Sequence, residues 1–252
     1  MKYLAYCVFS WLRGDIVNLP LGIEERPVLV VSGAGLSAAV SALADCDLAP
    51  EVSRLITYEQ VVEWFHRRQT VIPLRYGCLF EERSQIVRLL EERSGEYRWL
   101  LGELDGLVEM GIRVLVRSAG TQEASKALAP NAQPAKHCVS PGRAYLLSRN
   151  GHYASLEEGE ATLNTIAKII RDRLSGQFVR SREERTALSE RASLFSLHFL
   201  VPQPSVESFS RTVRNFEETL PGKLLLSGPW PPYNFVGRHG GCTAQERTRL
   251  QR

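Results

Sequence analysis

The sequence predicts an α+β protein of two domains, of which the second is ferredoxin-like and is followed by a C-terminal arm. Short runs of β-branched and aromatic residues alternate with helical stretches along the 252 residues. After residue 108 the predicted order is β-α-β-β-α-β, the ferredoxin-like pattern, with a helical insertion behind its first strand. Proline and aromatic residues follow the last strand. We therefore expect an N-terminal domain at 1–108, the ferredoxin-like domain at 109–228, and the arm with a mobile tail at 229–252.

The first domain is predicted to begin with strands at 3–9 and 28–32. The run at 36–44 is ambiguous by its period, and its alanines suit a helix. A helix is expected to begin at Thr57, because Thr57 and Gln60 have the spacing of a capping box. The buried face of this helix and the strand after it are predicted at Tyr58, Val61, Val62 and Phe65, and at 71–74.

A long amphipathic helix is predicted at about 81–107. Its apolar residues recur at alternating steps of three and four, which is the spacing of a coiled coil or of a helix packed on its own sheet. Arg93 is the one polar break, and Gly95 lowers the helix propensity. We expect the helix to pack on the core, with a partner-binding helix as the alternative. The stripe consists of Ile86, Leu90, Tyr97, Leu100, Leu104 and Leu107.

The second domain is predicted to begin with a strand at 110–116, where apolar residues alternate. A short helix is expected near 122–129, and Pro141 suits the first turn of the next helix. An edge strand at 178–182 and strands at 194–201 and 224–226 complete the sheet. Two further helices are predicted to bury Leu163, Ile166, Ala167, Ile170 and Leu174, and Val206, Phe209, Val213, Phe216 and Leu220.

The arm after residue 228 is the most distinctive segment of the sequence. Its three prolines lack the N–H that a central strand needs, so we expect the chain to leave the sheet here in an extended form. We expect the arm to pack on the protein's own domains across their junction, in preference to SH3-type recognition of its PxxP pattern. Full burial of the Trp230 ring would make Trp230→Ala cost ~3 kcal/mol or more. The candidate interaction residues are Trp230, Pro231, Pro232, Tyr233 and Phe235.

The bulk composition argues against several classes of protein. A formal net charge of +3 with interspersed acidic residues is a weak footprint for binding nucleic acid or anionic lipid. Residues 1–12 lack the cleavage site of a secretory signal, and no stretch reaches the ~20 apolar residues of a membrane span. The five cysteines form no CxxC pair and the five histidines lack metal-ligand spacing. We expect a soluble cytoplasmic protein with reduced thiols and no metal.

Residues 33–38 carry the main alternative, an NAD- or nucleotide-binding enzyme. They follow a predicted strand and resemble the NAD loop of sirtuin deacylases, whose glycines let backbone N–H groups approach a pyrophosphate. The paired CxxC motifs of those enzymes are missing from the sequence, so we expect a glycine turn and no catalytic or cofactor-binding residue. Weaker alternatives are catalysis by a Cys–His pair that includes Cys78 and an RNA-binding ferredoxin-like module.

Two arginines mark further candidate interaction sites. Arg75 follows an apolar strand and precedes Tyr76, so a bidentate ion pair or stacking on that ring are its two options. Arg143 lies two residues before Tyr145 in the first turn of a predicted helix, where a cation is unfavourable without an acidic partner. We expect structural ion pairs at both arginines rather than anion sites.

Three segments of the chain are distinctive in their order and spacing: 70–80 (TVIPLRYGCLF), 142–147 (GRAYLL) and 226–235 (LSGPWPPYNF). Together they resemble the gas vesicle protein F/L family. The resemblance runs over nearly the whole chain, from about residue 3 to 235, and departs at 150–153 and after Val236. It favours a strand for the ambiguous run at 36–44.

The resemblance implies a non-enzymatic minor component and assembly factor of gas-filled protein organelles. It implies contact with the major hydrophobic shell protein, of the GvpA type, and with other gas vesicle accessory proteins, so that shell subunits nucleate vesicles instead of aggregating. We expect an apolar patch near the domain junction to receive the shell subunit. No cofactor, nucleic acid, membrane or small-molecule substrate is expected. The expected location is the gas vesicle, and the cytoplasm before assembly.

Overall fold

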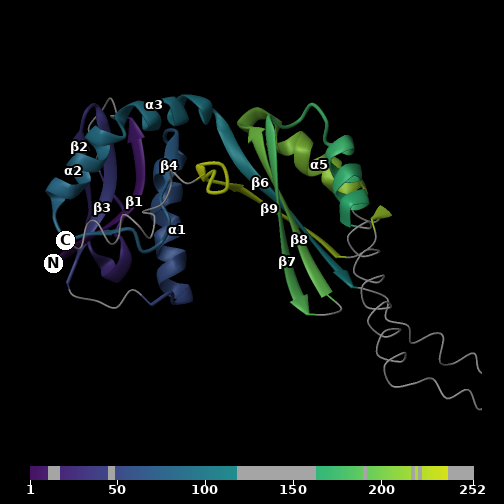
Figure 1. Cartoon of the computed structure of the whole chain (residues 1–252), viewed down its shortest axis with the longest axis horizontal. Coiled ribbons are helices and arrows are strands. Elements are labelled where there is room, and N and C mark those ends of the chain that lie inside the picture. Colours follow the sequence, from purple (N-terminus) through teal and green to yellow (C-terminus); the bar gives the residue numbers. More distant parts are fainter. Residues whose placement is uncertain are drawn as a thin grey trace, which may run out of the picture. The chain divides into compact units, whose positions relative to one another are not determined.

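The computed structural model describes residues 1–10, 18–44, 49–117, 163–189, 192–216, 219–220 and 223–237. These residues form an α+β protein with two antiparallel sheets (Figure 1). The chain divides into two compact units. Unit 1 comprises Met1–Met110, Phe199–Val206 and Ser227–Arg252, and unit 2 comprises Gly111–His198 and Glu207–Leu226. The α+β class predicted from the sequence is confirmed.

Unit 1 is built on a five-stranded antiparallel sheet of order β2-β3-β1-β4, in which β5 also pairs with β1. All residues of the central strand from Leu4 to Phe9 are buried, so elements must cover both faces of the sheet. A β-bulge between Ala5 and Cys7 shifts the register against β3. The strands are β1 (Lys2–Ser10), β2 (Val28–Gly33), β3 (Leu36–Leu43), β4 (Val71–Pro73) and β5 (Leu79–Phe80).

Helix α1 (Val52–His66) packs on one face of this sheet, against Leu4, Tyr6 and Phe9 of β1. The Tyr58 hydroxyl is buried there and donates to the Leu74 carbonyl oxygen at 2.8 Å. The buried face predicted from the sequence is confirmed, and it consists of Tyr58, Val61, Val62 and Phe65.

The predicted start of this helix at Thr57 is wrong, because α1 begins five residues earlier, at Val52. Thr57 is an interior residue whose hydroxyl donates to the Ser53 carbonyl oxygen at 3.1 Å, so it does not cap the helix. The first turn has apolar side chains on its exposed side, and this breaks the amphipathic pattern from which a helix start is inferred.

The predicted single helix at 81–107 is also wrong. The chain forms α2 (Arg83–Glu92) and α3 (Ser94–Glu103), which are separated by Arg93 at φ −106° and ψ 15°. Leu107 already belongs to the next strand, β6 (Leu107–Arg117). The apolar stripe nevertheless faces the core on the second face of the sheet, as predicted, and its buried members are Ile86, Leu90, Tyr97, Leu100 and Leu104.

The second sheet has the order β7-β8-β6-β9. A helix at 163–173 lies between β6 and β7 in the sequence, and α5 lies between β8 and β9. The strands and helix not yet given are β7 (Arg180–Ser189), β8 (Ala192–Pro202), α5 (Val206–Phe216) and β9 (Lys223–Trp230), with a 3-10 turn η2 (Gln203–Ser205) before α5.

The buried faces predicted for these elements are largely confirmed. Leu163, Ile166 and Ile170 are buried on the helix at 163–173, and Phe209, Val213 and Phe216 are buried on α5. On β8 the predicted side is buried as well, at Phe195, Leu197, Phe199 and Val201. Periodicity therefore identified the core of this part of the chain. The helices predicted near 122–129 and after Pro141 lie outside the described residues.

Two strand boundaries differ from the prediction. The edge strand expected at 178–182 is the ten-residue β7, and β9 continues through Pro229 to Trp230 instead of ending at 226. Proline is tolerated there because β9 is an edge strand, where a missing N–H need not break a hydrogen bond to a neighbour. The Gly228–Pro229 peptide bond is cis.

Candidate functional site

The glycine-rich segment 33–38 is a hairpin turn. Gly33 of β2 pairs with Leu36 of β3, which leaves Ala34 and Gly35 as a two-residue turn with φ angles of 53° and 72°. A strand and not a helix follows the turn, so no helix N-terminus is present here to bind a pyrophosphate. This geometry contradicts the NAD-loop alternative. The glycines are accounted for by the tight turn that reverses the chain between β2 and β3.

The two cysteines that the structure describes, Cys7 and Cys78, are buried in unit 1. Cys7 is fully buried, and burial raises the pKa of its thiol far above the ordinary range. Cys78 is 3% exposed, so it is not accessible to a substrate in this conformation. Across the described ranges, no group of three or more His, Cys, Asp and Glu side chains converges as metal ligands would. None of the described helices has the length and apolar character needed to traverse a lipid bilayer.

The aromatic side chains of β8 do not form a base-stacking surface. Phe195 and Phe199 are fully buried, whereas RNA-binding sheets present such rings to solvent. The RNA-binding alternative therefore lacks its main requirement on this strand.

The segment after β9 docks on unit 1. Pro231, Pro232 and Val236 are buried, whereas Trp230 is 44% exposed. A cost of ~3 kcal/mol for Trp230→Ala was predicted only for a fully buried ring, so the partial exposure of Trp230 means that this cost no longer applies. Asn234 makes two hydrogen bonds to the buried Glu109 carboxylate: its backbone N–H donates to Oε2 at 2.8 Å and its side-chain amide to Oε1 at 2.6 Å. These two bonds fix the segment to β6.

Tyr233 brings the same segment against α1. Its ring packs on the α1 side of the core, and burial raises the pKa of its hydroxyl, with a further rise from the nearby Glu59 carboxylate. Burial also raises the pKa of Glu59 itself, while the Tyr233 hydroxyl lowers it and the charges of Glu63 and Glu109 raise it further. Glu59 is thus a partly buried acid of α1 held beside the docked segment.

We expect Glu59→Gln to stabilise the protein at neutral pH. Since the folded-state pKa of Glu59 lies above its ordinary 4.5, the folded protein resists its ionisation, and stability is lost as the pH rises from 4.5 through the folded pKa. The gain at pH 7 should be a few tenths to about 1 kcal/mol, because solvent screens this partly exposed group. Urea unfolding at pH 7 and pH 4.5 measures it. An equal difference between variant and wild type at both values would contradict the raised pKa.

The outer face of α1 exposes an apolar group at its N-terminal end. Val52, Leu55 and Ile56 are 74%, 37% and 52% exposed, and they lie at the i, i+3 and i+4 positions of one helix face. Isolated exposed apolar side chains are common, but three adjacent ones on two turns form a patch of the kind that marks interaction sites. This patch was not predicted from the sequence, because the helix was expected to begin after these residues, at Thr57.

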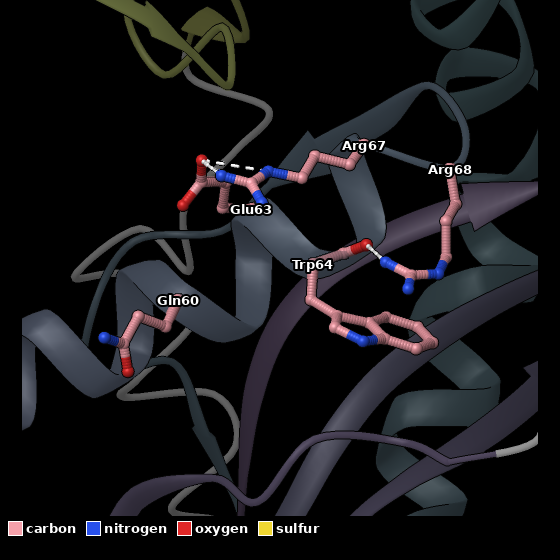
Figure 2. Close-up of a pocket in the computed structure, with 5 residues that line it drawn as sticks. All are labelled: Gln60, Glu63, Trp64, Arg67 and Arg68. Atoms are coloured by element: carbon pink, nitrogen blue, oxygen red, sulfur yellow. Dashed lines mark hydrogen bonds and ion pairs between the residues drawn. The ribbon is translucent and has the colours of Figure 1, made fainter.

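A shallow pocket with a cavity volume of about 540 Å³ lies at the other end of the same helix. The Arg67 guanidinium donates to Glu63 Oε1 at 2.6 Å, and the Arg68 guanidinium lies over the Trp64 ring, 3.7 Å from its centroid (Figure 2). Arg68 also donates to the Trp64 carbonyl oxygen at 2.7 Å. The pocket is lined by Gln60, Glu63, Trp64, Arg67 and Arg68.

The remaining candidates lie in different places, and of those described Tyr76 contacts α1. Arg75 is exposed, and the structure shows neither the expected ion pair nor stacking on Tyr76 among the described residues. Tyr76 packs its ring edge-on to Tyr58 at a centroid distance of 5.4 Å. Arg143 and Tyr145 lie outside the described residues. The arm residue Phe235 packs on the other core, beside α2 and α3.

Known proteins resemble this chain over almost all of it. The family model of the gas vesicle synthesis proteins GvpL/GvpF matches residues 2–237. Gas vesicle protein L of Streptomyces sp. (strain CB03234) is 26% identical over 92% of this chain and 91% of its own. Gas vesicle protein F of the same organism is 24% identical over 91% and 98%.

Solved structures agree in fold. The crystal structure of GvpF from Anabaena sp. PCC7120 matches with a TM-score of 0.73 at 18% identity, over 93% of this chain and 95% of that one. GvpF from Microcystis aeruginosa matches with a TM-score of 0.71 at 19% identity, over 93% and 98%. The resemblance predicted from three sequence segments is confirmed. The chain belongs to the gas vesicle GvpL/GvpF family.

Proposed function

We propose that this protein is a non-enzymatic minor component and assembly factor of the gas vesicle that contacts the hydrophobic shell protein. Membership of the family supports a role among gas vesicle proteins. The observation that carries the contact is the exposed patch of Val52, Leu55 and Ile56 on α1, which we assign to the shell subunit. The protein would act in the cytoplasm before assembly and then stay with the vesicle, next to other accessory proteins.

The physical reason for such a factor lies in the shell subunit. A subunit that forms a water-repelling wall aggregates in water unless a partner covers its apolar surface or strand edges. Burial of apolar area contributes about 25 cal/mol per Å², so a small patch gives reversible binding. Reversibility is what nucleation requires, because the subunit must leave the factor to enter the shell.

We further propose that β6 to β9 form a ferredoxin-like unit. The sheet order β7-β8-β6-β9 and the succession β6, helix 163–173, β7, β8, α5, β9 support this assignment. The proposed interaction surface on α1 belongs to unit 1.

Aggregation of purified shell protein tests the contact. Shell protein diluted from denaturant should scatter less light in the presence of this chain. The triple variant Val52→Ser, Leu55→Ser, Ile56→Ser should need roughly tenfold more protein for the same effect, because about 1.4 kcal/mol of apolar contact is lost.

Val179→Ser is the matched control, since Val179 is an equally exposed apolar residue of unit 2. It should act like wild type. Equal activity of the triple variant and the wild type would remove α1 from the proposal, and no suppression by the wild type would overturn the proposed function itself.

A further inference from the structure

We infer that the open edge of β2 binds an extended apolar strand of the shell subunit, which joins the sheet of unit 1 beside β2. This inference rests on the proposed function, since it specifies a further contact with the same partner. It adds the mode of recognition, which is backbone hydrogen bonding along β2 between apolar side chains on both faces of the sheet.

The backbone groups of alternate β2 residues point away from the sheet. The pair that flanks the two-residue turn, Gly33 with Leu36, is hydrogen-bonded. In an antiparallel ladder this bonding recurs at every second residue. Leu29 and Val31 therefore bond to β3, whereas the N–H and C=O groups of the residues next to them point outward.

This outward edge is closed at its start and open beyond it. The Val28 N–H points outward and donates to the Pro20 carbonyl oxygen at 3.4 Å, which covers the first residue of β2. Within the described ranges, β2 pairs with β3 alone, and the outward backbone groups of Val30 and Ser32 have no hydrogen-bond partner. Ser32 is exposed and Val30 is half-buried, so a second backbone can reach these groups.

The other sheet edges carry features that prevent pairing with a strand of another protein. β5 has two residues, β4 has three and ends in Pro73, β7 carries four consecutive charged residues at 182–185, and β9 contains Pro229. β2 has six residues, VLVVSG, and they include no charge and no proline. Its pairing with β3 also runs without a bulge. Of the described edges, β2 is therefore the one best suited to accept another strand.

Apolar side chains flank the open edge on both faces of the sheet. Leu29 and Val87 are partly buried on the face that α2 covers, and Val87 Cγ1 would lie 3.2 Å from a Cβ atom on Gly33. Leu19 and Val30 are partly buried on the α1 face. A strand that pairs here is covered on both faces, so we expect a continuous apolar run and not an alternating one. An apolar shell subunit can supply such a strand, and β2 would then cover an edge through which that subunit aggregates.

Hydrogen exchange of the full chain, resolved to single residues, tests the inference with purified shell protein as the probe. In the chain alone, the amides of Val30 and Ser32 should exchange about tenfold faster than those of Leu29 and Val31, which bond to β3. Addition of shell protein should slow the exchange of the Val30 and Ser32 amides about tenfold and leave the other two unchanged.

Two substitutions at one position separate the backbone from the side chain. Ser32→Pro removes an outward N–H and leaves the bonds of Leu29 and Val31 to β3 in place, so the affinity for shell protein should fall about tenfold. Ser32→Ala loses the same hydroxyl, with its 2.9 Å contact to Ser37 Oγ, but keeps the N–H, so it should bind like wild type. Urea unfolding shows whether both variants remain folded, and the exchange experiment on the wild type depends on neither.

The outcomes separate this inference from the proposed function. If shell protein is kept from aggregating while the Val30 and Ser32 amides exchange as in the chain alone, the strand pairing is wrong and the proposed function stands. Equal affinities of folded Ser32→Pro and Ser32→Ala would also contradict the pairing. If the wild type binds no shell protein, both proposals are wrong. Protection of these amides that grows with the concentration of this chain alone would show that a second copy occupies the edge, and would overturn the inference.

Discussion

Gly228→Ala is expected to destabilise the protein by about 2–5 kcal/mol. Gly228 has φ +111°, and a Cβ atom there would lie 2.7 Å from the Glu109 carbonyl oxygen and 3.0 Å from Met110 Sδ. The strain of a side chain at this φ costs about 1–2 kcal/mol and overpacking about 1–3 kcal/mol. The backbone of β6 cannot move away from this Cβ atom without disturbing its pairing with β8 and β9. The free energy of unfolding from urea titration measures the effect.

Gly77→Ala is the matched control. Gly77 also has a positive φ, of 85°, but a Cβ atom there would have nothing within 4 Å. Gly77→Ala should therefore lower the free energy of unfolding only by the strain of a side chain at this positive φ, about 1 kcal/mol. Equal losses for the two variants would mean that the close approach of Gly228 to β6 is not present in solution.

Glu109→Ala is expected to cost about 2–4 kcal/mol and to release the segment after β9. The substitution leaves both Asn234 donors without their acceptor, and each lost bond to a charged group contributes about 1.5–3 kcal/mol, less the cost of burying the carboxylate. Hydrogen exchange should show the release directly, because the backbone amide of Asn234 would lose its protection.

A double-mutant cycle of Glu109→Ala with Asn234→Ala separates this bond from general damage. The cycle should give a coupling free energy of at least about 1 kcal/mol. Glu81→Gln, at an exposed ion pair with Lys2, is the control and should change stability by less than about 1 kcal/mol. Additive losses in the cycle would show that Glu109 does not hold the segment.

Periodicity predicted the cores of both sheets well. The alternation at Phe195, Leu197 and Phe199, and the helical stripe through Leu90 and Leu100, each needs one buried face, so sequence alone locates them. Periodicity cannot locate a break between two helices when the apolar stripe continues across it. Here α2 ends and α3 begins on either side of Arg93, while the stripe stays on the core-facing side of both helices. Helix boundaries depend on backbone angles that periodicity does not record.

The candidate site was harder to predict for a physical reason. Val52, Leu55 and Ile56 are apolar and exposed, so they contradict the pattern by which a surface helix is recognised. The pairing of Glu109 with Asn234 joins residues 125 positions apart, and no local rule connects them. The proline-rich segment is distinctive in the sequence, but the distant residues on which it packs are not.

Site-specific cross-linking in vesicle-forming cells tests the central claim, that α1 is the surface that touches the shell protein. A photoreactive residue in place of Ile56 should cross-link to the shell protein, whereas the same residue in place of Val179 should not. Shell protein captured at Val179 and absent at Ile56, in cells that still form vesicles, would contradict the account.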